Sequence, residues 1–90
     1  MRKEYEMILA KELRLLAIET RERLNLTQRE MSNRLQMSES SYSDIETGKY
    51  MCSTLTASLL LNMQDDPNAF LHRVEGKFNE YYAKEMQLTC

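Results

Sequence analysis

The sequence predicts an all-α protein of five helices, and three observations support this. It contains one Pro and two Gly in 90 residues, whereas Leu, Glu, Met and Arg, which favour helices, are abundant. Apolar residues recur at intervals of three and four along most of the chain. Ser, Thr or Asp stands where four of the helices are expected to begin. The length suits one domain with a single core.

The first helix is expected over residues 4–24. Its apolar residues repeat every three or four positions, which places them on one face over about five turns. Asn25 suits the turn that follows. The apolar face consists of Tyr5, Ile8, Leu9, Leu13, Leu16, Ala17 and Leu24.

The second helix begins with a capping box. Thr27 is an N-cap hydroxyl, and Glu30 stands three residues later, so each side chain can bond the other's backbone N–H. Met31 and Leu35 lie four apart and are expected to face inward.

A third short helix follows a tight turn and covers about residues 39–47. Ser38 is its expected N-cap, and Tyr42 and Ile45 are its inward residues. Gly48 suits the left-handed position that ends a helix. Two helices of about two turns each are unstable alone, so the remaining helices must form their base.

The fourth helix is expected to start at Ser53 or Thr54 and to bury Leu55, Leu59 and Leu60. Leu61 and Met63 are expected to continue this buried face.

The last helix starts at Asp66 and Pro67, a favourable N-cap and first-turn pair, and can run to about residue 87. Its apolar residues again follow helical spacing. They are Leu71, Val74, Phe78, Tyr81 and Leu88, with Ala69, Phe70, Tyr82 and Met86 beside them.

Several functional classes are disfavoured. No run of about 18 apolar residues indicates a membrane span, and the charged N-terminus is unlike a signal peptide, so a cytoplasmic protein is expected. Cys52 and Cys90 are expected to be free thiols, and with only His72 no zinc-ligand set can be written. The sequence shows no catalytic Cys/His pair, glycine-rich phosphate loop or carboxylate dyad. We therefore expect neither an enzyme nor a bound cofactor or metal.

The central segment resembles the Cro/phage-repressor-type (Xre-like) helix-turn-helix family. The residues that carry the resemblance are Thr27-Gln28, the inward Leu35, Met37-Ser38, and Ile45-Glu46-Thr47-Gly48-Lys49. With the flanking helices it covers about Leu13 to Leu71. It implies a five-helix repressor-like domain with a helix-turn-helix core (13–66). An N-terminal helical extension (residues 1–12) and a long C-terminal helix (67–90) go beyond what the family's pattern requires. Ser32 and Gln36 depart from the pattern, since the family prefers Ala and Gly there.

The resemblance implies a sequence-specific transcriptional regulator whose third helix, about residues 38–47, reads the major groove of double-stranded DNA. It further implies an ion pair between Arg21 and Glu46 that ties the first helix to the end of the third. The positions matching the family's DNA contacts are Gln28, Arg29, Ser38, Glu39, Ser40, Ser43, Asp44, Lys49, Tyr50 and Ser53.

The charge is unusual for this function. The formal net charge is −2, from 12 basic and 14 acidic residues, whereas DNA-binding domains are usually basic. The third helix has neither Arg nor Asn/Gln on its reading face; Glu39 and Asp44 can accept from cytosine N4, but they also repel phosphates. The alternative is an antitoxin- or adaptor-like protein-interaction module whose acidic third helix docks a basic protein partner.

The two terminal extensions need a covering surface. We expect them to pack together, either within one chain or across the two-fold axis of a homodimer, which would place two recognition helices one DNA turn apart. The packing residues are Tyr5, Ile8 and Leu9 at the N-terminus, and Leu71, Val74, Phe78 and Tyr81 at the C-terminus.

Overall fold

The computed structural model describes the backbone of residues 2–89 and the side chains of residues 2–87. The expected thiol of Cys90 and the place of Leu88 in the apolar face lie outside these described residues. The described chain forms five helices and no strand: α1 (Arg2–Arg23), α2 (Gln28–Arg34), α3 (Glu39–Glu46), α4 (Thr54–Asn62) and α5 (Pro67–Thr89). The predicted all-α fold is confirmed.

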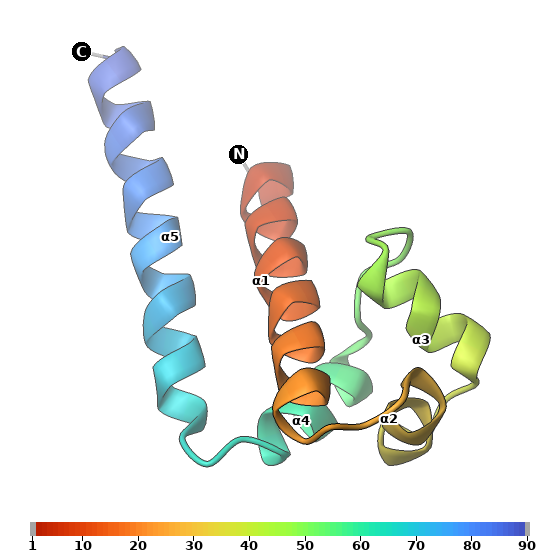
Figure 1. The fold of residues 1–90 in the computed structure, drawn as a ribbon. Coiled ribbons are helices and arrows are strands. Elements are labelled where there is room, and N and C mark those ends of the chain that lie inside the picture. Colours follow the sequence, from red (N-terminus) through yellow and green to blue (C-terminus); the bar gives the residue numbers. More distant parts are fainter. Residues whose placement is uncertain (1, 90) are drawn as a thin grey trace.

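Helix α1 is the centre of the arrangement. The α2–α3 pair lies on one side of it, α5 runs antiparallel to it on the other, and α4 crosses near its C-terminal end (Figure 1). The core lies where these helices meet. Its buried residues are Leu13, Leu16, Ala17, Met31, Leu35, Tyr42, Leu60, Phe70 and Val74.

Local hydrogen bonds begin the short helices as predicted. The Thr27 hydroxyl accepts from the Glu30 N–H at 3.1 Å, and the Glu30 carboxylate accepts from the Thr27 N–H at 2.9 Å, which completes the capping box. Ser38 caps α3 and Ser53 caps α4, each accepting from the N–H three residues ahead.

The turn between α2 and α3 is built without glycine. Gln36 adopts a φ of 59°, and the Met37 N–H donates to the Ser32 carbonyl at 3.0 Å. Ser32 is buried, and its hydroxyl donates to the Arg29 carbonyl at 2.7 Å. Compared with Ala, Ser32 adds a hydroxyl, and this hydroxyl has a hydrogen-bond partner. Ser32 therefore fits between the two closely crossing helices without an unpaired buried polar group.

Several residues of the predicted apolar faces are exposed. Leu55 is 63% exposed, because it lies in the first turn of α4 on the face away from the core, and Thr56 and Leu60, four residues apart, are buried instead. Leu71 is 49% exposed, because Phe70 and Val74 occupy the inward positions of α5. Leu24 follows the end of α1 and is also exposed.

The packing of α1 on α5 occurs within one chain. The Tyr5 ring makes edge-on contacts with the rings of Phe78 and Tyr81, both with centroids 5.1 Å apart. Leu9 and Phe78 pack against the core, and Ile8 is half-buried. Arg73 of α5 reaches the buried carboxylate of Glu12, 2.9 Å from Nε to Oε1. An aromatic cluster and a buried ion pair thus join the two long helices.

Candidate nucleic-acid interface

The C-terminal end of α3 is held by the carboxylate of Glu46, whose side chain is only 8% exposed. Arg21 of α1 donates to both carboxylate oxygens, from Nε at 2.6 Å and from Nη2 at 3.2 Å. Gln28 of α2 donates from Nε2 at 2.9 Å, and the Tyr42 hydroxyl also donates to this carboxylate. One carboxylate therefore connects α3 to α1 and to α2. We call Arg21, Gln28, Tyr42 and Glu46 the Glu46 cluster.

Titration of these groups follows from their contacts. Burial raises the pKa of Glu46, but the hydrogen bonds from Arg21, Tyr42 and Gln28 outweigh it, so the pKa of this carboxyl lies below its usual value. Burial, together with the hydrogen bond to Glu46, raises the pKa of the Tyr42 hydroxyl well above its ordinary value. At neutral pH the cluster consequently contains a carboxylate, a guanidinium and a neutral phenol.

Arg14 makes a further contact that sequence reasoning missed. Its Nη1 donates to the Glu46 backbone carbonyl at 3.3 Å. The last carbonyls of a helix lack intrahelical partners, so Arg14 helps to satisfy the end of α3. Its side chain also lies beside Gly48, which takes a φ of 81°. No sequence pattern indicated this contact, since Arg14 belongs to no motif.

The outer face of α3 carries the positions that the resemblance assigned to base reading. Glu39 and Ser40 are exposed, and Ser43 and Asp44 are half-buried. The Ser38 hydroxyl accepts from the Ser41 N–H as the cap of α3, so its main role is structural. This face offers two carboxylates and two hydroxyls, groups that can each accept or donate single hydrogen bonds.

The flanking cations come from outside α3. Arg29 on α2 is exposed, as are Lys49 and Tyr50 in the segment that follows α3. The ammonium of Lys49 lies 6.0 Å from the centre of the Tyr50 ring, at the outer limit for a cation–π contact. Ser53 uses its hydroxyl to cap α4. The structure thus brings Gln28 into the Glu46 cluster, whereas Arg29 and Lys49 remain open to solvent.

Two short helices joined by a tight turn and supported on a longer one define a helix-turn-helix unit. A family model described as "Helix-turn-helix domain" matches residues 8–62, more than half of the chain, and the protein belongs to this family. No curated protein and no solved structure gives a significant match. The match ends before α5, so the last helix lies outside the family's common part.

Helix-turn-helix domains in general bind DNA, and the family is typically non-enzymatic. None of the helices described is both long and apolar enough to cross a membrane. Over the same described residues, no group of His, Cys, Asp and Glu is arranged to hold a metal ion.

Proposed function

We propose that the protein is a sequence-specific DNA-binding transcriptional regulator of the Cro/phage-repressor type, with α3 inserted in the major groove. The observation that carries this proposal is the Glu46 cluster, which clamps the inner side of α3 to α1 and α2 and leaves Glu39 and Ser40 in solvent. A recognition helix must be held rigidly from behind while its outer side chains stay free.

In this arrangement the proposed roles divide by position, on α3 or beside it. Arg29, Lys49 and Tyr50 contact phosphates and set the register, whereas Ser40, Ser43 and Asp44 meet base edges. Gln28 is a positioning residue, because its amide nitrogen donates to Glu46. Glu39 accepts from cytosine N4 and weakens binding wherever it faces a phosphate.

Binding to random-sequence duplex tests the electrostatic part. We expect weak binding in low salt that falls as salt rises, because basic side chains displace counterions from the phosphates. With Arg29 and Lys49 as the only two proposed basic phosphate contacts, the slope of log K against log salt should be about −2. Fluorescence anisotropy of a labelled duplex over a salt series measures it, and selection from a randomised library then identifies the preferred sequence.

The protein-interaction alternative is favoured by one observation. Glu39 and Asp44 are the only charged residues of α3 besides the internally bonded Glu46. Absence of any duplex binding at low salt would contradict the DNA proposal and support docking of this acidic face on a basic protein partner.

We also infer that the regulator is a homodimer. The residues expected to form the dimer contact are largely covered within the chain, but α5 leaves Leu71, Tyr82 and Met86 exposed at spacings of eleven and four, on one side of the helix. Such a stripe supports two-fold pairing along α5.

Light scattering should give twice the 10.7 kDa chain mass at micromolar concentration. The double variant Tyr82→Glu, Met86→Glu should give the monomer mass; a monomeric wild type would refute the dimer.

A further inference from the structure

We propose that the groove between α1 and α5 binds a small amphipathic anion, meaning a carboxylate or phosphate ester that carries an aryl or alkyl group. The groove has a volume of about 450 Å³, within the range of small-molecule sites. Its lining residues come from α1 and α5, and α5 lies on the side of α1 opposite the α2–α3 pair (Figure 1), so no residue of α3 belongs to the groove.

Positive charge gathers in this groove although the chain as a whole is acidic. Four of its lining residues are basic (Lys11, Arg73, Lys77 and Lys84), and two, Glu12 and Glu80, are acidic. The lining therefore has a formal charge of +2, against −2 for the whole chain. This local excess of positive charge favours an anion over a cation as the ligand.

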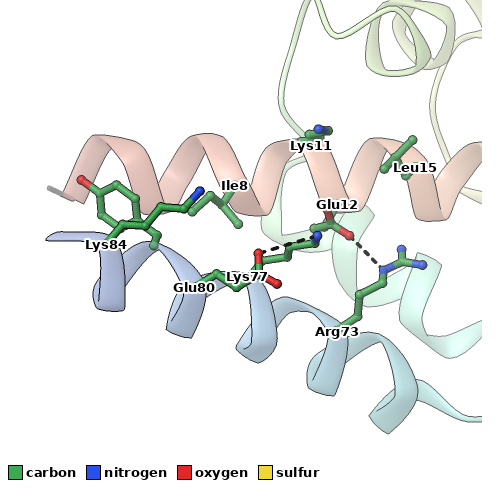
Figure 2. A pocket seen from close by; sticks show the side chains of 9 residues that line it. Ile8, Lys11, Glu12, Leu15, Arg73, Lys77, Glu80 and Lys84 are labelled. Carbon is green, nitrogen blue, oxygen red and sulfur yellow. Dashed lines mark ion pairs between the residues drawn. The ribbon is translucent and has the colours of Figure 1, made fainter. Parts of the chain in front are cut away.

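Arg73, one of these four cations, already forms ion pairs within the chain. Arg73 is paired with the buried Glu12 (Figure 2). Its Nη1 atom also lies 3.3 Å from the Glu19 carboxylate, so Arg73 mainly joins the helices. Its Nε and Nη2 atoms are buried without a well-aligned hydrogen bond in the described part of the chain, although Nε lies 2.9 Å from the Glu12 carboxylate.

The lysines are the groups open to a ligand. Lys77 has only a long contact with Glu80, 3.9 Å from Nζ to Oε2. Within the described residues Lys84 forms no ion pair, and its side chain lies along the groove between the two helices (Figure 2). Lys77 rises from the same face of α5, seven residues earlier. Seven helical residues span about 10.5 Å, so the two ammonium groups stand at separate points along the groove, and the charged head of a ligand can pair with either of them.

The apolar part of the lining decides the class of anion. Ile8 and Leu15 lie two turns apart on the same side of α1, and the Tyr81 ring adds an aromatic surface from α5. All three are half-buried, so each keeps some apolar area that a ligand can cover. A purely polar ion would leave the apolar surface of these three side chains exposed to water. An aryl or alkyl group attached to the charged head would cover it.

NMR titration of the full chain tests this proposal. The probes are phenyl phosphate and octanoate, with inorganic phosphate and neutral benzyl alcohol as controls. At least one of the amphipathic anions should give saturable shifts confined to amides of α1 and α5, with both controls binding at least about tenfold more weakly. Which of the two binds better distinguishes a phosphate ester from a carboxylate ligand.

Matched lysine variants locate the site. The double variant Lys77→Gln, Lys84→Gln should raise the dissociation constant of the preferred probe by about tenfold or more, because both candidate cationic partners of its charged head are removed. Lys3→Gln, a similarly exposed lysine of α1 outside the groove, should leave it within about twofold. All three positions are exposed or half-exposed, so the melting temperature should not change.

Three results would contradict the proposal. Absence of saturable shifts with both amphipathic probes would refute the site. Equal affinity for inorganic phosphate would refute the amphipathic class, and equal weakening by Lys3→Gln would show that only general charge attraction is at work. None of these outcomes bears on duplex binding by α3.

Discussion

Replacing Glu46 with Ala is expected to lower the free energy of unfolding by about 3–5 kcal/mol, because it removes one partner of a buried, hydrogen-bonded ion pair. The Arg21 guanidinium, the Gln28 amide and the Tyr42 hydroxyl all donate to this carboxylate and would lose their acceptor together. Urea unfolding followed by circular dichroism measures the loss.

Glu22→Ala is the matched control, since Glu22 is an exposed glutamate of α1 with no ion pair in the described structure. Its effect should stay within about 0.5 kcal/mol. Equal stability of the Glu46→Ala and Glu22→Ala proteins would show that the cluster contributes no stability.

The same carboxylate should make stability depend on acid pH. Its pKa is lowered in the folded protein, so its contribution is complete above the unfolded pKa of about 4.3 and is lost as pH falls through the lower folded value. The difference in free energy of unfolding between wild type and Glu46→Gln should therefore be largest near neutral pH and shrink on acidification. A difference that stays constant would mean that the folded pKa of Glu46 is not lowered.

Ser40→Glu is expected to weaken duplex binding by about tenfold or more. It adds a third carboxylate to the outer face of α3 and removes a hydroxyl from the proposed base-reading set, and a base contact contributes about 1–3 kcal/mol. The fold should hold, because a carboxylate in the first turn of a helix is favourable.

Ser58→Glu provides the control, as Ser58 is also an exposed helical serine but lies on α4. Anisotropy titration with the selected duplex compares the two variants with wild type at one salt concentration. If Ser40→Glu binds as tightly as Ser58→Glu, α3 does not enter the groove and the proposed reading face is wrong.

The sequence predicted best what depends on neighbouring residues. The capping box at Thr27 and Glu30 and the caps at Ser38 and Ser53 involve groups three residues apart, so composition and spacing were enough to place the helix starts. Helical periodicity likewise gave the five helices and most of the core. For the candidate site, the outward position of Glu39 and Ser40 was implied by the family resemblance, and both residues are exposed.

A missed signal was present at Glu12. This residue lies on the apolar face of α1, three after Leu9 and four before Leu16. A charged residue at such a position requires a buried partner. Spacing could not name that partner, because Arg73 is 61 positions away and its own neighbours form no motif.

By itself, then, the amino-acid sequence determined the all-α class, the helix boundaries to within a few residues and the helix-turn-helix segment, because these depend on local hydrogen bonds and on a repeat of three to four residues. Only the tertiary structure decided that α5 packs on α1 of the same chain, that Thr56 and not Leu55 is buried, and that Arg14 and Arg73 reach their partners. An apolar stripe indicates that one face of a helix must be covered, but it does not indicate which distant segment covers that face.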